Sequence, residues 1–167
     1  ENLLSAAERR ALLNGENKTY IRVSDFLNTI PSVTGKVELV YEGEQEGAGH
    51  VAQVLMGKDI RTQFLKYFTD PDKAKKAKTG NTYKAITDWF GDGNTIDILN
   101  DASAADYKKA LNKVPGLQEL IEKHQPKAKG DEKLFLMEFA LHGLAEHSQL
   151  SKNRLSTGLQ FKDLLSG

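Results

Sequence analysis

The most constraining feature of the sequence is a segment near its C-terminal end that is predicted to be a helix with almost no polar side. Residues 131–150 form this last expected helix, and apolar side chains occur nearly all round it between Leu134 and Ala145. A helix of this kind lies in the middle of a bundle, because it has no face to offer to water. We therefore expect other helices to surround it.

The rest of the chain also spaces its apolar residues as helices do, and no segment shows the convincing alternation of a strand. A first helix is indicated at residues 2–14, with Gly15 following as a C-terminal cap. Further helices are expected at 24–31, 82–90 and 103–113, and others are expected to begin at Asp70 and Pro115. Residues 36–68 are expected to form one long helix or two collinear helices. The predicted fold class is therefore all-α, a multi-helix bundle.

Composition narrows the classes of function. Lys plus Arg and Asp plus Glu both number 23, so the formal net charge is zero, which argues against a dedicated nucleic-acid or membrane-surface binder. The absence of cysteine excludes disulfides, thiolate catalysis and cysteine-ligated zinc. No apolar run approaches the roughly 18 residues of a membrane-spanning helix. We expect a cytoplasmic protein that binds neither nucleic acid nor membrane.

The chain carries only a fragment of a nucleotide-binding motif. Thr34-Gly35-Lys36-Val37 contains the Gly-Lys pair of a P-loop, but it lacks the upstream glycine and the following hydroxyl residue. These residues are therefore predicted not to hydrolyse a nucleotide. Because the chain begins at Glu1 without methionine, we expect it to be cut from a longer protein.

Two stripes of glutamate and histidine form a candidate metal site. Glu138, His142 and Glu146 follow one another at intervals of four on the apolar helix. Glu46 and His50 repeat that interval on a second expected helix, and residues four apart share one helix face. A freestanding helical bundle could therefore hold a metal between the two stripes. The structural alternatives are a solvated acidic face or a histidine paired with carboxylates inside the bundle. They are favoured because the Glu-x-x-His pair of di-iron bundles does not occur.

The first residues carry a resemblance to a known family. Residues 7–15 read Ala-x-x-Arg-Ala-Leu-x-x-Gly, and Asp25 opens the next helix after a short connector. This pattern resembles the helical lid of the magnesium-chelatase and MoxR-like AAA+ ATPases. Residues 34–47 and 139–146 are similar to bacterial members of the magnesium-chelatase subunit I type. One departure is Glu16, which stands where the lid usually has an arginine.

The resemblance implies a division of labour along a longer chain. Residues 1–35 would be the end of an AAA+ lid, and residues 36–167 a C-terminal helical extension. The P-loop and the metal-binding acids would lie upstream, so the parent chain would bind ATP and Mg²⁺ and hydrolyse ATP. Residues 1–167 would be non-catalytic and hold no cofactor of their own.

The resemblance also implies partners and residue roles. Rotation of the lid with nucleotide state would carry the extension as a rigid body and change the surface offered to a partner. The expected partners are the chain's own AAA+ module, the neighbouring subunits of the ring and a von Willebrand A domain protein. Arg9 and Arg10 are expected to position the lid. Glu42, Glu44 and Glu46 are expected, on charge grounds, to dock the partner.

Overall fold

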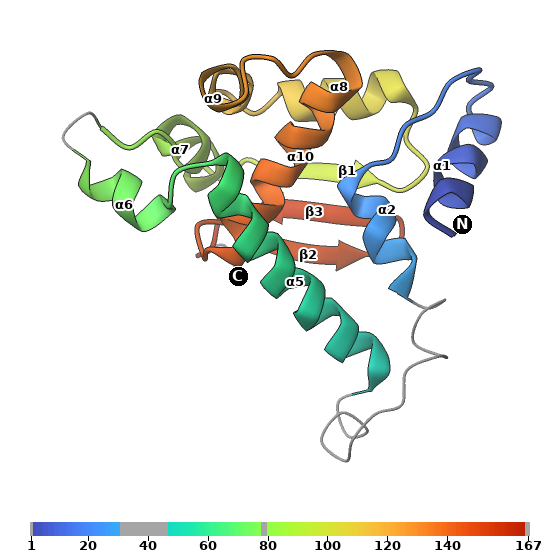
Figure 1. Ribbon diagram of the computed structural model, residues 1–167, viewed down its shortest axis with the longest axis horizontal. Coiled ribbons are helices and arrows are strands. Elements are labelled where there is room, and N and C mark those ends of the chain that lie inside the picture. Colours follow the sequence, from blue (N-terminus) through green and yellow to red (C-terminus); the bar gives the residue numbers. More distant parts are fainter. Residues whose placement is uncertain (1, 31–46, 78–79, 166–167) are drawn as a thin grey trace.

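The computed structural model describes residues 2–30, 47–77 and 80–165. Eight helices and three strands follow one another within these ranges. The helices are α1 (Asn2–Leu13), α2 (Val23–Asn28), α5 (Ala48–Tyr67), α6 (Pro71–Lys76), α7 (Lys84–Gly91), α8 (Ala104–Asn112), α9 (Leu117–His124) and α10 (Gly130–Glu146), and the strands are β1 (Ile96–Leu99), β2 (Ser151–Leu155) and β3 (Gly158–Lys162) (Figure 1). None of these helices combines the length and the apolar character needed to cross a membrane.

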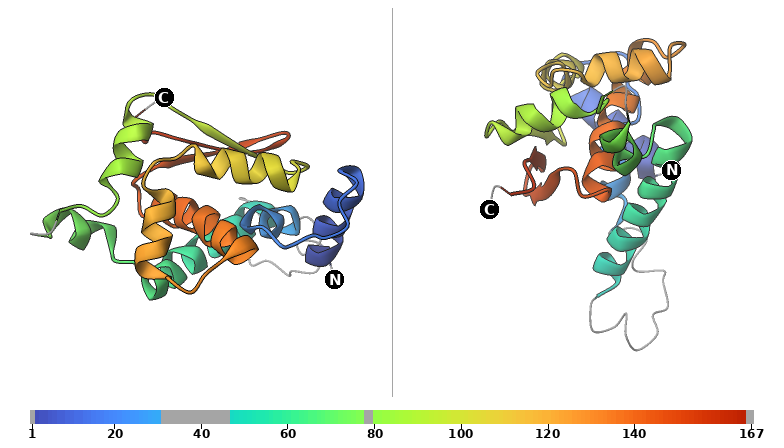
Figure 2. Two further views of the ribbon diagram at one scale, coloured as in Figure 1. Left: turned by 90° about the horizontal axis from the view of Figure 1, so that it is seen from above. Right: turned by 90° about the vertical axis from the view of Figure 1, so that its left-hand side faces the viewer.

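The apolar segment expected at the middle of the molecule is α10. Every residue from Leu136 to Leu144 is buried, and the helix contacts α2, α5, α8, α9 and β2. Figure 2 shows α10 between the sheet on one side and α5 on the other. The prediction that this helix lies at the centre is confirmed, although it ends at Glu146 rather than near Leu150.

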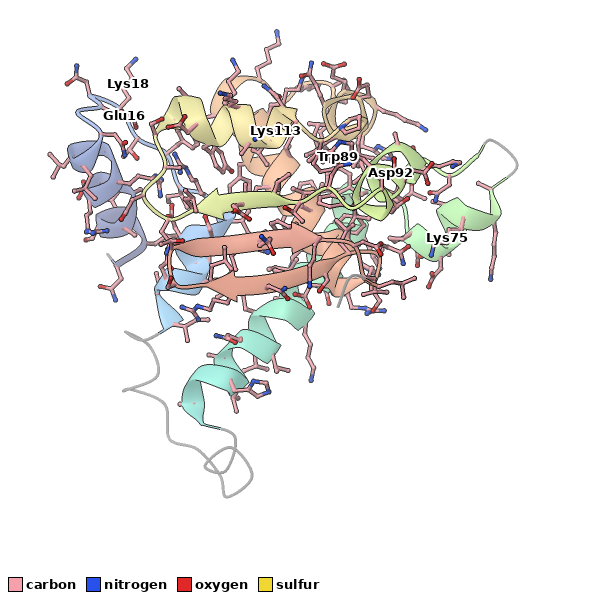
Figure 3. All side chains as sticks on the ribbon, turned by 180° about the vertical axis from the view of Figure 1, so that it is seen from behind. Glu16, Lys18, Lys75, Trp89, Asp92 and Lys113 are labelled. Carbon is pink, nitrogen blue, oxygen red and sulfur yellow. The ribbon has the colours of Figure 1, made fainter. Side chains whose placement is uncertain are left out.

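The prediction of an all-α fold is wrong, because the structure contains a three-stranded antiparallel sheet. The strand order is β1-β3-β2, with Ile98 of β1 opposite Leu159 of β3 and Asn153 of β2 opposite Gln160 of β3. Figure 3 shows the sheet from its outer side, with the helices behind it. The fold is therefore mixed, with helices as the larger part.

The three strands were not predicted because each has only four or five residues, and buried and exposed side chains alternate clearly only in β1. β1 has four residues, and only Ile96 and Ile98 alternate as buried side chains. β2 reads Ser-Lys-Asn-Arg-Leu and has no fully buried residue. The turn between β2 and β3 is Ser156-Thr157, without the glycine or asparagine that marks the commonest two-residue hairpins. Alternation becomes a strand signal only when it persists over several residues.

The helix expected over 36–68 is observed as α5, which begins at Ala48; residues 36–46 lie outside the described ranges. The C-terminal half of α5 packs on α10, where Phe64 lies directly against Gly143. A Cβ atom at that glycine would be 2.0 Å from Cδ2 of the phenylalanine ring. Four rings meet at this crossing and are called the aromatic core: Phe64, Phe68, Tyr83 and Phe139.

Candidate functional site

Buried polar side chains gather where the N-terminal helices α1 and α2 meet α8 and α10. Each of these side chains belongs to a residue that is at most 2% exposed to solvent. We call them the Glu138 network, and they are Arg10, Arg22, Asp25, Tyr107, Glu138 and His142. The network is the largest concentration of buried charge among the described residues.

The carboxylate of Glu138 on α10 caps the N-terminus of α2. Its Oε2 accepts hydrogen bonds from the Val23 backbone N–H at 2.8 Å and from the Tyr107 hydroxyl at 2.6 Å. Its Oε1 accepts from the Ser24 backbone N–H at 2.9 Å. The N-cap residue of α2 itself, Arg22, makes no side-chain capping bond. A helix usually receives this bond from its own N-cap residue, whereas α2 receives it from a side chain far along the chain.

A second buried pair joins α1 to α2. Arg10 of α1 lies 2.5 Å from Oδ1 of Asp25, and its other terminal nitrogen donates to the Tyr20 carbonyl at 2.7 Å. The second oxygen of Asp25 accepts from the Arg22 backbone N–H at 2.8 Å. Arg10 stands in the Ala-x-x-Arg-Ala motif and Asp25 stands in the helix that follows the motif. These two residues therefore form an ion pair.

Arg22 is held by aromatic rings rather than by carboxylates. Its guanidinium carbon lies 4.2 Å from the ring centroid of Tyr107 and 5.7 Å from that of Tyr20. Its Nε and Nη1 atoms are buried and have no hydrogen-bond partner among the described residues. Burial, and then the charge of Arg10, lower the pKa of Arg22 from its ordinary value. A cation desolvated over a ring face is attracted to it by up to about 2 kcal/mol.

The charges of the network balance. Two cations, Arg10 and Arg22, face two anions, Asp25 and Glu138. Ions that leave water without a counter-ion cost several kcal/mol each. The network therefore keeps its balance only while α1, α2 and α10 hold their relative positions.

His142 extends the network along α10 toward the sheet. Its Nε2 lies 3.6 Å from Oε1 of Glu138, which is too long for a hydrogen bond, and its Nδ1 lies 3.5 Å from Nζ of Lys152 on β2. Lys152 in turn pairs with Glu146 at 2.8 Å. The Glu146 carboxylate packs on the backbone of α5 at Gly57, where a Cβ atom would lie 2.6 Å from Oε2.

Burial and the neighbouring polar groups act in opposite directions on the pKa values of the two buried titratable groups of α10, Glu138 and His142. Burial alone would raise the pKa of Glu138, but the hydrogen bonds that its carboxylate accepts from the Tyr107 hydroxyl and the Val23 N–H hold that pKa below its ordinary value. Burial lowers the pKa of His142, with Glu138 opposing it. The carboxylate is therefore ionised and the imidazole neutral at pH 7.

Contacts nearer the surface reinforce the link between α1 and α8. Glu16, which departs from the lid pattern, accepts a hydrogen bond from the Ala104 backbone N–H at 2.7 Å at the start of α8, and Figure 3 shows it near α1. Asn14 donates to the Asp101 carbonyl at 3.0 Å. Arg9 pairs with the Asp101 side chain at 2.8 Å, with both side chains more than half exposed.

The two arginines that were predicted to position the lid lie in different environments. Arg10 lies in the buried network, whereas its neighbour Arg9 lies at the surface. Glu42, Glu44 and Glu46 lie outside the described ranges. The expected roles of these residues in positioning and docking stay predictions.

The five residues of the metal hypothesis are only partly brought together. Glu138, His142 and Glu146 do form one line along α10, linked through Lys152, and not a solvated face. His50 lies at the exposed start of α5, and Glu46 is not described. Within the described part of the chain, no group of three or more metal-ligating side chains occurs. Of the alternatives left open by the sequence, the geometry matches a histidine beside a carboxylate inside the fold.

Sequence reasoning missed Arg22 and Tyr107. Both belong to amphipathic side-chain types that are usually half-exposed, and neither stands in a motif. The only available signal was indirect: a polar stripe on an otherwise apolar helix, at Glu138 and His142, requires buried partners somewhere in the fold.

The network is suited to holding elements together rather than to reacting with a substrate, because its polar groups are closed to solvent. It connects α1 and α2 with α8, α10 and, through Lys152, β2. The chain matches no protein-family model, no curated protein and no solved structure.

Proposed function

We propose that the chain is the coupling segment of a magnesium-chelatase-like AAA+ ATPase, in which the lid end moves the C-terminal part with nucleotide state and so controls the docking of a partner. The parent chain supplies ATP, Mg²⁺ and hydrolysis, and the ring works in the cytoplasm. The partners are the chain's own AAA+ module, the neighbouring subunits and a von Willebrand A domain protein.

One observation carries this proposal: the carboxylate of Glu138 on α10 caps α2, which belongs to the lid-like segment. Leaving a buried hydrogen-bond donor without its acceptor typically costs about 1 to 3 kcal/mol for each donor. A hinge between α2 and α10 would have to break such contacts, so motion of α2 carries α10 with it. This is the behaviour that transmission from a lid to an extension requires.

The proposal is tested first at the gene. We expect a Gly-x4-Gly-Lys-Ser/Thr motif encoded within a few hundred residues upstream of the codon for Glu1. A start codon immediately before that codon would contradict the proposal.

The second test uses the longer protein and the variant Glu138→Gln. The amide keeps the volume of the side chain but presents an NH₂ group to an N–H donor, so one cap of α2 is lost. We expect the basal ATPase rate to persist and its response to the partner to fall. The matched control is Glu132→Gln at an exposed position of the same helix. An unchanged partner response in Glu138→Gln would overturn the coupling role of the network.

A further inference from the structure

β2 is an edge strand with a cleft beside it. The sheet order is β1-β3-β2, so no described strand pairs with the outer side of β2. A cavity of about 200 Å³ lies between β2 and α5. Its walls include the apolar side chains of Met56, Ile60 and Leu159, and its charged lining residues are Glu146, Lys152 and Arg154.

The charged residues of β2 lie on the inner side of the sheet. Lys152 and Arg154 are two residues apart and so share one face of the strand. In the register they stand opposite Phe161 and Leu159, which are buried against the helices. Lys152 is paired with Glu146, whereas the side chain of Arg154 is exposed to solvent and makes no hydrogen bond or ion pair with any described residue. The cleft therefore carries one uncompensated positive charge.

The positive charge of Arg154 determines which kind of strand can pair with the outer edge of β2. Inward-pointing charges on an edge strand prevent unwanted pairing. A second copy of β2 would bring its own Lys152 and Arg154 against the same two side chains, and like charges opposite one another destabilise a sheet. A strand that carries carboxylates at its inward positions would instead pair with Arg154 and compete with Glu146 for Lys152.

We propose that β2 is a docking edge for an extended acidic segment of a protein partner. Such a segment adds as a fourth strand, with main-chain hydrogen bonds to β2 and a carboxylate side chain in the cleft between β2 and α5. The apolar cleft walls accept a neighbouring aliphatic side chain. This inference rests on the partner-docking part of the proposed function and names its surface and the chemistry of its partner.

The docking edge is connected to the Glu138 network. Nζ of Lys152 lies 3.5 Å from Nδ1 of His142, and the same histidine lies beside Glu138, which caps α2. If a partner's carboxylate draws Lys152 away from Glu146, only the side chains of His142 and Glu138 separate this change from α2, the helix of the lid-like segment.

The test is a selection of ten-residue peptides from a random displayed library on the 167-residue chain without nucleotide. We expect the enriched peptides to alternate Asp or Glu with β-branched residues and to protect the backbone amides of β2 from hydrogen exchange. Enrichment of peptides without acidic residues, of peptides with helical apolar spacing, or of none at all would overturn the proposal.

Two variants assign the binding to the cleft. Arg154→Glu is expected to weaken the selected peptides by at least about tenfold, because attraction becomes repulsion across the new pair. Lys75→Glu carries the same reversal of charge on α6, away from the sheet (Figure 3), and is expected to bind as the wild type does. Equal binding to both variants would overturn the proposal. Because no nucleotide is involved, failure here leaves the ATPase tests standing, and their failure leaves this one standing.

Discussion

α10 passes through two regions that are held together by different forces. At one, the Glu138 network joins it to α1, α2 and α8 through charged groups and hydrogen bonds. At the other, the aromatic core joins it to α5 through ring packing around Phe64, where Gly143 allows the two helices to approach. Both regions are buried, yet one contains four ionised side chains and the other none.

The comparison shows that the aromatic core contributes mainly to the stability of the fold, whereas the Glu138 network specifies how the helices are arranged. Apolar burial is non-directional and contributes most of the free energy of folding, and cores tolerate apolar substitutions of similar volume. A buried ion pair often adds little net stability, but it is costly to leave half-paired. The aromatic core therefore holds α5 on α10, while the Glu138 network defines where α2 sits.

The largest effect is expected from Glu138→Ala. The change leaves two backbone N–H groups of α2 without an acceptor and the Tyr107 hydroxyl with only the Leu134 carbonyl at 3.5 Å, and it leaves the network with an excess of positive charge. Each buried donor left without its acceptor costs about 1 to 3 kcal/mol, so we expect the free energy of unfolding to fall by about 3 to 5 kcal/mol, measured by chemical denaturation. Glu132→Ala, at an exposed site on the same helix, should change it by less than about 0.5 kcal/mol. If Glu138→Ala and Glu132→Ala lowered the free energy of unfolding equally, the Glu138 network would not contribute to the stability of the fold.

A smaller effect is expected where the aromatic core is overpacked. Gly143→Ala places a Cβ atom 2.0 Å from the Phe64 ring, and such crowding typically costs about 1 to 3 kcal/mol. Gly57→Ala is the matched change on α5, but its Cβ atom meets the flexible end of Glu146, so we expect it to be milder. Thermal unfolding of both variants compares them. If Phe64→Leu does not relieve Gly143→Ala in the double variant, the steric explanation fails.

Acidification should weaken the network before the aromatic core. The pKa of buried His142 lies below its ordinary value of 6.5. Below about pH 6.5 the histidine is therefore protonated in the unfolded chain but stays neutral in the folded chain, and the folded state loses stability as the pH decreases. The pKa of Glu138 is also lowered from 4.5; its contribution is present above that pH and is lost as the pH drops through the folded value. Both groups therefore act in the same direction.

Denaturation midpoints between pH 8 and pH 4 measure this effect. We expect a plateau above pH 7, a first decline below pH 6.5 and a second below pH 4.5. In His142→Gln the first decline should be reduced, since the amide does not titrate. An identical profile in this variant would show that His142 does not couple folding to pH.

The parts of the fold that the sequence predicts are those with a long, regular signal. The apolar helix around Leu141 and its central position follow from composition around the helix axis alone. The helices expected to begin at Asp70 and at residue 103 are also observed, and at each start the N-cap side chain accepts a backbone N–H. The sheet could not be predicted, because β1 and β2 are too short to establish a period and are paired only through contacts distant in sequence.

Only part of the candidate site could be predicted from the sequence. The interval between Glu138 and His142 marks polar groups on an apolar helix, which indicates a buried partner without identifying it. Their actual partners, Tyr107 and the amides at the start of α2, are supplied by tertiary packing. Among the buried contacts of the network, the ion pair of Arg10 and Asp25 joins two residues that both stood within a pattern visible in the sequence.

The smallest effect is expected from Arg9→Ala, next to the buried Arg10. Arg9 pairs with Asp101 at 2.8 Å, as closely as many buried pairs, but the side chains are 67% and 52% exposed. Water and salt screen such a pair, so its removal should cost between zero and about 1 kcal/mol. Arg10→Ala, one residue further, strands Asp25 in a buried site and should cost about 3 to 5 kcal/mol. Denaturation at low and high salt distinguishes them, because only the Arg9 effect should vanish in salt. If the two neighbours behaved alike, burial would not be what separates the network from the surface.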